Sequence, residues 1–232
     1  MESVLLIHNA LGIHEILRHL IFLPSQEVIS MILAMWSGGK DSAMAFYRAS
    51  KLYKIDRLVC MIKNGETRAH RLKESILRRQ SEAMGIEIVF GRYDENFEEI
   101  LKSVFRSNEA EKVVFGDIYL EHHRNWIERV CKELGIEAIF PLWGENTKKL
   151  AEDIAREFNA IVIAVRKNFK DILGRRFDEE VIEYLLKKNA DPCGENGEFH
   201  TIVVDGPIFK KPIEVTIGKH FEDEKYYYLE VL

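Results

Sequence analysis

Short apolar runs alternate with helical patterns along most of this chain, and this alternation limits the folds that it can adopt. From Met31 onward, runs rich in apolar and β-branched residues predict strands over residues 32–36, 58–62, 86–90, 113–115, 138–140 and 161–165. Between them, apolar residues spaced three and four apart predict helices over 43–52, 72–84, 97–105, 126–134 and 150–158. Parallel strands need crossover connections, which place helices on both faces of a sheet. The sequence therefore predicts an α/β fold with a doubly wound parallel sheet.

The pattern changes after about residue 170. A short helix is predicted over 179–188, a loop rich in Gly, Pro and Asn over 189–197, and strands over 201–204, 213–217 and 226–231. We therefore expect a main domain over residues 31–170 and a smaller C-terminal α+β lobe over residues 171–232.

Residues 1–30 differ from both regions, because they carry a helical apolar stripe that ends at Pro24. One interpretation is an N-terminal extension that packs on the core or on a partner. The other is a start assigned too early, with Met31 as the true first residue. The stripe has no cationic stretch before it and no small-residue cleavage site after it, so we do not expect a signal peptide.

The composition argues against several classes of protein. Lys and Arg number 33 and Asp and Glu 38, so the net charge of −5 has the wrong sign for stable binding of nucleic acid. Cys60, Cys131 and Cys193 are widely spaced, which argues against a disulfide framework or a zinc ribbon. The apolar runs are far shorter than the roughly 20 residues that span a bilayer. We expect a cytoplasmic protein that binds no membrane.

The first predicted strand is followed directly by a hexamer of phosphate-binding character: Ser37, Gly38, Gly39, Lys40, Asp41 and Ser42. Its glycines allow a tight turn that points amides at an anion, its lysine adds a positive charge, and its serines add hydroxyl donors. The N-terminus of the next helix points at the same place. We expect this loop to hold the phosphates of a nucleotide, with Asp41 either capping the helix or holding magnesium. The spacing does not fit the P-loop of kinases and GTPases, G-x-x-x-x-G-K-[ST].

Further candidate residues lie where predicted strands end or helices begin. Gly116 and Asp117 end a strand on the same side as the hexamer, where a glycine lets adenine or ribose approach the backbone. Arg124 begins the next helix and is placed to pair with a phosphate or a carboxylate. His70, in the loop after the second strand, is a candidate phosphate ligand, with a solvated or helix-capping histidine as the alternative.

A second polar block lies in the C-terminal lobe and reads Glu195, Asn196, Gly197, Glu198, Phe199, His200 and Thr201. Its two acids, three residues apart, are suited to hold ammonium or magnesium or to act as a base toward an amine. The alternative is a solvated turn before a strand. We do not expect the neighbouring Cys193 to be a nucleophile, because nothing beside it in sequence lowers its pKa.

These blocks together resemble a known family. The hexamer after a first strand is similar to the PP-loop of N-type ATP pyrophosphatases, which have a doubly wound α/β fold. The block from Gly194 to Thr201, with Asp205-Gly206-Pro207, resembles the C-terminal signature of the diphthine-ammonia ligase family. The resemblance runs from about Met31 to the end of the chain and takes in His70, Gln80, the turn at Gly116 and Asp117, and Arg124.

The resemblance implies an activity. Members of that family use ATP to adenylate the carboxylate of diphthine, a modified histidine of elongation factor 2, and ammonia then displaces AMP to form an amide. ATP, magnesium, ammonium and elongation factor 2 as protein substrate follow from it. We accordingly assign catalytic roles to Lys40, Asp41, Arg124, Glu195 and Glu198. Asn196, Gly197, His200 and Thr201 are assigned to the substrate side.

The chain departs from the family pattern in its substrate half. Asn196 stands where a glycine is usual, Asp117 where a small residue is usual, and Trp126 where an arginine is expected. Three alternatives therefore stay open: a related enzyme acting on another carboxylate, a tRNA-modifying enzyme of the same superfamily, and a non-enzymatic adenine-nucleotide-binding protein. We also consider a homodimer.

Overall fold

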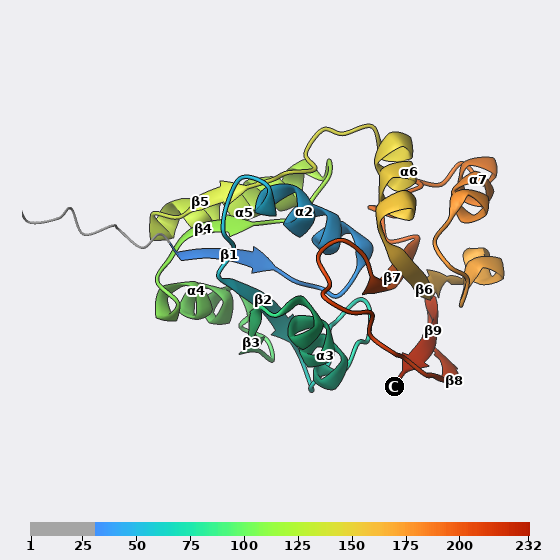
Figure 1. Cartoon of the computed structure of the whole chain (residues 1–232), viewed down its shortest axis with the longest axis horizontal. Helices are drawn as coiled ribbons and strands as arrows, with labels where there is room; N and C mark the ends of the chain where they lie inside the picture. The colour runs from blue at the N-terminus through green and yellow to red at the C-terminus, as the bar shows by residue number, and fades with distance from the viewer. Residues whose placement is uncertain (1–30) are drawn as a thin grey trace, which may run out of the picture. The chain divides into compact units, whose positions relative to one another are not determined.

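Five parallel strands form the main sheet of the chain, whose computed structural model describes residues 31–232. In order across the sheet they are β3 (Glu87–Arg92), β2 (Arg57–Ile62), β1 (Met31–Met35), β4 (Ala110–Val114) and β5 (Glu137–Ile139) (Figure 1). Every neighbouring pair is parallel. The described part of the chain begins in the middle strand, continues to one edge and then to the other, so the predicted doubly wound sheet is confirmed. The apolar stripe predicted in residues 1–30 lies outside the described residues.

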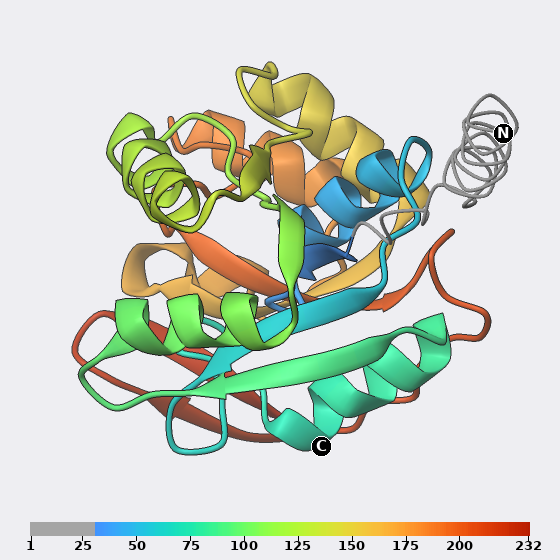
Figure 2. The same cartoon turned by 90° about the vertical axis from the view of Figure 1, so that its left-hand side faces the viewer.

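Helices cover both faces of this sheet (Figure 2). One face carries α4 (Phe97–Ser107) and α5 (Glu121–Leu134), and the other carries α2 (Lys40–Ser50) and α3 (Glu74–Met84). Buried side chains alternate between the two faces along each strand: Leu33 packs in the core under α4 and α5, and Ile32 and Ala34 pack in the other core. Burial on both faces is why these strands are continuous apolar runs in the sequence.

Two further helices have capping residues at their N-termini. The side chain of Asn146 accepts a hydrogen bond from the backbone N–H of Lys149 at the start of α6 (Thr147–Glu157). Asp178 does the same for α7 (Glu179–Lys187), which follows the 3₁₀ segment η1 (Lys167–Ile172). Such caps satisfy backbone donors that the first turn leaves free. None of the helices within residues 31–232 has the length and apolar content needed to cross a membrane.

A second sheet, antiparallel, forms the smaller C-terminal part. Its order is β7 (Phe199–Asp205), β6 (Asn159–Arg166), β9 (Tyr226–Val231) and β8 (Ile217–Glu222). The strand predicted at 161–165 therefore exists, but the expectation that it extends the parallel sheet is wrong. A central antiparallel strand buried on both faces has the same apolar pattern as a parallel one, so periodicity does not separate the two cases.

The strand predicted at 213–217 is also wrong in position. Residues 211–216 form no strand, and β8 begins at Ile217. This edge strand is largely exposed and carries Lys219, His220 and Glu222, so it lacks the apolar alternation that marks a strand in sequence.

Gln80 of α3 joins the two sheets. Its side chain is fully buried, accepts a hydrogen bond from Trp36 Nε1 at 3.0 Å, and donates to the carbonyl oxygens of Gly38 at 3.0 Å and Val203 at 2.8 Å. The backbone N–H of Val203 donates to Gly38 O at 3.0 Å, and that of Lys40 donates to Thr201 Oγ1 at 3.1 Å. The loop after β1 is therefore fixed directly against β7.

We predict that Gln80→Leu destabilises the fold by about 2–4 kcal/mol, because it leaves a buried indole N–H and a buried carbonyl without their partner. Urea unfolding followed by circular dichroism measures the change. Glu82→Leu, at an exposed position of the same helix, is the matched control and should change stability by less than about 0.5 kcal/mol. Equal stability of the two variants would contradict the role given to Gln80.

Candidate functional site

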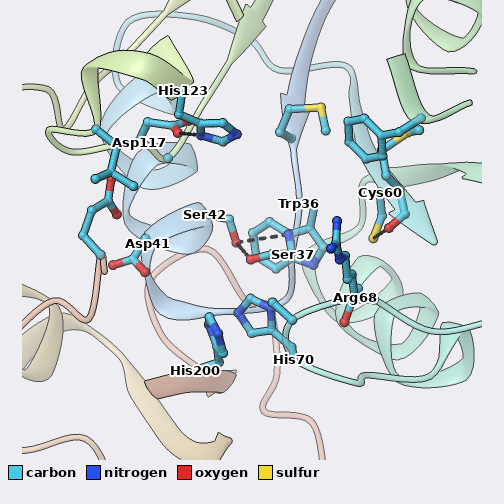
Figure 3. Close-up of a pocket in the computed structure, with 18 of the residues that line it drawn as sticks. Trp36, Ser37, Asp41, Ser42, Cys60, Arg68, His70, Asp117, His123 and His200 are labelled. Atoms are coloured by element: carbon cyan, nitrogen blue, oxygen red, sulfur yellow. Dashed lines mark hydrogen bonds and ion pairs between the residues drawn. The ribbon is translucent and has the colours of Figure 1, made fainter. Parts of the chain in front are cut away.

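A cavity of about 680 Å³ opens at the carboxyl ends of β1, β2 and β4 (Figure 3). Cavities of this size suit small molecules and cofactors. The carboxyl ends of the strands are also where doubly wound sheets bind ligands. Its wall includes eight of the residues singled out from the sequence: Ser37, Asp41, Ser42, His70, Gly116, Asp117, Glu195 and His200.

The hydroxyls of the hexamer meet at the cavity wall. Ser42 Oγ donates to Gly39 O at 2.9 Å and lies 3.1 Å from Ser37 Oγ, which in turn accepts from the N–H of Gly39 at 3.3 Å (Figure 3). The loop thus turns back on itself, and α2 starts at Lys40 directly behind it. Hydroxyls, loop amides and a helix N-terminus at one point form an arrangement suited to phosphate.

Three glycines of the site are required by close approach. Gly38 has φ +83°, in the left-handed region that side chains avoid. A Cβ on Gly39 would lie 2.6 Å from His70 Nε2, and one on Gly116 would lie 3.2 Å from the backbone of Asp41 and Ser42. The glycine after β4 thus allows close packing against the first turn of α2, and the expected approach of adenine or ribose to this cavity-lining residue stays a prediction.

Lys40 is buried and does not line the cavity. Its side chain is 2% exposed, and its ammonium pairs with the Asp41 carboxylate at 2.8 Å, donates to Cys193 O and lies 4.8 Å from the ring centre of Phe199. Burial alone would lower the pKa of Lys40, but the Asp41 carboxylate raises it, so the lysine stays charged. Burial raises the pKa of Asp41, although the Lys40 charge opposes this. The predicted contact of Lys40 with phosphate remains a prediction.

Acidic groups gather on one side of the cavity. Glu195 accepts a hydrogen bond from the N–H of Ile118 at 2.9 Å, so the second polar block reaches the end of β4. Burial raises the pKa of Glu195 to about 7, and the charges of Asp41 and Asp117 act in the same direction. Asp117 contacts His123 and raises the pKa of that imidazole. Glu195 is therefore placed to change its protonation state near neutral pH.

Two histidines form the opposite wall. The rings of His70 and His200 lie 4.8 Å apart between centres, and both face the cavity (Figure 3). Burial lowers the pKa of His200 to about 4 and lowers the pKa of His70 well below its usual range, and the nearby charge of Lys40 acts in the same direction. Both imidazoles are neutral at pH 7, so they contact a ligand as hydrogen-bonding rings and not as cations.

Four members of the second block do not line the cavity. The side chain of Asn196 donates to Tyr119 Oη at 2.9 Å, Gly197 O accepts from Tyr226 Oη at 2.6 Å, and Thr201 accepts from the Lys40 amide. Glu198 is 6% exposed, and its Oε2 has no hydrogen-bond partner among the residues that the structure describes.

Arg124 also lies away from the cavity wall. It pairs with Glu128 at 2.6 Å, and its guanidinium lies 4.6 Å from the ring centre of Trp143. The structure therefore does not bring Arg124 together with the hexamer, and its catalytic role stays a prediction.

The remaining lining residues were not assigned to the site from the sequence: Met35, Trp36, Cys60, Met61, Thr67, Arg68, Ala69, Tyr93, Phe97, Leu120, His123 and Trp126. Most of them are apolar or aromatic and look like core residues in a sequence. Trp126 is the exception, because it stands where an arginine was expected. Its ring stacks on His123 at 5.8 Å, and its Nε1 donates to Glu98 at 2.7 Å.

The thiols of Cys60 and Cys193 are free and buried. Burial raises the pKa of the Cys60 thiol to about 12 and raises that of the Cys193 thiol as well, so neither is a thiolate near neutral pH.

Within residues 31–232, His, Cys, Asp and Glu form no group of three or more that could hold a metal ion. A magnesium ion commonly has one or two carboxylate ligands and takes the rest from phosphates and water. The carboxylate of Asp41 on the cavity wall fits that mode.

The strand order and the hexamer at the end of β1 define a PP-loop α/β protein. Residues 30–138 match the profile described as diphthamide synthase N-terminal domain, and residues 146–231 match the one described as diphthamide synthase C-terminal domain. The chain therefore belongs to the diphthamide synthase family.

Curated relatives agree with this family. The chain is 34% identical over 129 residues to the diphthine-ammonia ligase of Rattus norvegicus and 34% identical over 128 residues to that of Homo sapiens, which is 52% of this chain and 48% of each relative. The chain thus spans about half the length of these relatives. A solved structure, a predicted subunit of tRNA methyltransferase from Methanocaldococcus jannaschii, covers 80% of this chain and all of its own at 16% identity, with a TM-score of 0.42. A likeness at this level says nothing about function.

The raised pKa of Glu195 gives a prediction about stability. Between the ordinary pKa of 4.5 and the folded-state value of about 7, the folded protein binds more protons than the unfolded chain, so stability falls as pH rises through this window. Glu195→Gln removes that loss of stability. The free energy of unfolding of the variant, relative to that of wild type, should be about 2 kcal/mol higher at pH 8 than at pH 5.

Urea unfolding at the two pH values measures this difference. Glu82→Gln, at an exposed position, is the control and should show no such gain. A Glu195→Gln variant whose difference from wild type is the same at both pH values would show that Glu195 does not titrate in this window.

Proposed function

We propose that this protein is an ATP-dependent amide-forming ligase that adenylates a carboxylate and transfers ammonia to it, with the diphthine residue of elongation factor 2 as acceptor. The observation that supports it most is the meeting of two blocks at one cavity. Ser37, Asp41 and Ser42 of the hexamer and Glu195 of the second block line the same wall. The curated relatives carry the name diphthine-ammonia ligase.

The hexamer is suited to the pyrophosphate that leaves when a carboxylate takes AMP from ATP. The hydroxyls of Ser37 and Ser42 and the N-terminal amides of α2 converge there, and fixed donors of this kind stabilise charge that develops on a leaving group. Asp41 would hold magnesium, which would neutralise further charge on the phosphates. The positive charge of Lys40, which does not line the cavity, acts on the site through its ion pair with Asp41.

Glu195 and Glu198 are candidates for handling ammonium. Glu195 has a pKa of about 7, so near neutral pH it is suited to accept a proton from an amine that attacks the acyl adenylate. Glu198 Oε2 is buried and lacks a hydrogen-bond partner within the described residues, and an ammonium ion is a donor that would satisfy it. The Glu198 carboxylate does not line the cavity, so the observation that supports its role in binding ammonium is the oxygen without a partner.

The direct experiment incubates the protein with ATP, magnesium, isotopically labelled ammonium and diphthine-bearing elongation factor 2. Mass spectrometry of the factor should show the labelled amide, and AMP and pyrophosphate should appear in equal amounts. Release of AMP that depends on another carboxylate would move the acceptor to a different substrate. Failure to release AMP with any carboxylate would favour a nucleotide-binding protein without this activity. The oligomeric state, including a homodimer, and the cytoplasmic location stay predictions.

A pair of serines on α2 tests the loop assignment. Ser42 and Ser50 each donate to a carbonyl oxygen three residues earlier at 2.9 Å, but only Ser42 lines the cavity. We predict that Ser42→Ala slows acceptor-dependent AMP formation by about a hundredfold, since the hydroxyl that fixes the loop through Gly39 O and Ser37 Oγ is lost. Ser50→Ala removes the same kind of helix bond and should leave the rate within about twofold. Equal rates in both variants would remove Ser42 from the phosphate site.

A further inference from the structure

A second cavity of about 550 Å³ adjoins the first and takes no part in the proposed binding of ATP. The two cavities share Arg68, Ala69 and His200 in their walls. The rest of its wall comes from Arg71, in the loop between β2 and α3, from the turn between β8 and β9, and from the first residues of β9. Arg68, Ala69 and His200 therefore lie at the junction of the two cavities.

A row of rings runs from the second cavity to the phosphate loop. Tyr228 lies 5.8 Å from Tyr226, Tyr226 is stacked 5.9 Å from His200, and His200 lies 4.8 Å from His70, each measured between ring centres. His70 ends the row against Gly39, where even a Cβ would come within 2.6 Å of Nε2. The ligand best suited to such a row carries a flat ring that stacks along it.

The charges in the second cavity leave one cation at the junction. Arg71 pairs with Glu66 at 2.6 Å, and Asp223 accepts hydrogen bonds from Tyr228 Oη and from the backbone of its own turn. Four charged groups that line this cavity form no ion pair within residues 31–232: Arg68, Asp223, Glu224 and Lys225. Three of them lie together on the turn between β8 and β9, where the charge of Lys225 offsets part of the acidic charge. Arg68 is left where the two cavities meet.

An arginine at this point is suited to hold a carboxylate, because its fork of N–H groups matches two oxygens. We propose that the second cavity is the acceptor site. The proposed acceptor side chain lies along the row of rings, and Arg68 holds its carboxylate at the junction with the nucleotide cavity. This inference rests on the proposed function and adds to it the place of the acceptor and the residue that holds its carboxylate.

The step at the junction is balanced by the substrates alone. A carboxylate oxygen forms a bond to the α phosphorus of ATP, while the bond from that phosphorus to the bridging oxygen breaks and its electron pair leaves with pyrophosphate. No proton is transferred in this step. Arg68 touches the attacking carboxylate, whereas the hexamer faces the phosphates.

Kinetics of three variants test the role of Arg68. With diphthine-bearing elongation factor 2 as substrate, Arg68→Gln should lower kcat/KM for the factor by about ten- to a hundredfold, the effect of losing a charge-assisted hydrogen bond. The KM for ATP should change less than twofold. Arg68→Lys keeps the charge without the fork and should restore part of the loss. Arg106→Gln, an exposed arginine without an ion pair inside 31–232, is the control.

The opposite split would overturn the inference: a raised KM for ATP with an unchanged KM for the factor would place Arg68 in the nucleotide site. Loss of activity in the Arg106→Gln control as well would do the same, because the effect would then not be specific to the junction.

A binding measurement keeps the inference separate from the proposed function. Imidazolepropionate, a planar ring with a terminal carboxylate, is titrated into the full chain saturated with AMP, and the amide signals are followed by nuclear magnetic resonance. The shifts should cluster at Ala69, Lys225 and Tyr226. The affinity for imidazolepropionate that they report should fall at least tenfold in Arg68→Gln. Clustered shifts without any modification of elongation factor 2 would support this cavity and reject that acceptor. Absent shifts, or shifts confined elsewhere, would reject the cavity as the acceptor site.

Discussion

The position of the phosphate loop depends on one buried amide. Gln80 receives the indole N–H of Trp36 at the end of β1 and donates to carbonyl oxygens of Gly38 in the loop and Val203 in β7. It is fully buried, so water is not at hand to replace any of these partners, and each one left unpaired would cost about 1–3 kcal/mol. The shape of the loop is therefore set jointly by the parallel sheet, by α3 and by the antiparallel sheet. The smaller C-terminal lobe therefore contributes directly to the site that the parallel sheet carries.

This joint also determines the electrostatics of the cavity. Because β7 and the loop before it press against the hexamer, the ammonium of Lys40 is enclosed by Asp41, Cys193 O and the ring of Phe199 and is withdrawn from the wall. Of the acids on the wall, Asp41 pairs with the withdrawn Lys40 and Asp117 contacts His123. A triphosphate brings further negative charge to such a wall. Loop amides and hydroxyls are suited to stabilise part of that charge, and in the proposed reaction Asp41 would hold a divalent cation that neutralises more of it.

Local patterns predicted what depends on local chemistry. Strands buried on both faces and helices with one apolar face gave the doubly wound sheet, and the spacing of small, hydroxyl and charged residues gave the hexamer at the end of β1. Which sheet a strand joins is not local: β6 looks like a sixth parallel strand until its partners β7 and β9 are known. Nor is the direction of a side chain, since Lys40 turns toward Cys193, 153 positions away, and Arg124 packs on Trp143. Aromatic lining residues such as Trp36 are indistinguishable from core residues in a sequence.

The departures from the family pattern become interpretable in the structure. Gly197 has φ +79° and needs to be glycine, but Asn196 is not among the positive-φ residues of the described chain, so its backbone tolerates a side chain. That side chain donates to Tyr119 Oη and Glu198 Oε1 and so ties the block to the turn after β4. Trp126 stacks on His123, which contacts Asp117 on the cavity wall. Both substitutions thus make contacts with the chain's own residues around the cavity. They change what supports the wall, while the hexamer, Glu195 and the junction at Arg68 keep the positions that the proposed chemistry requires.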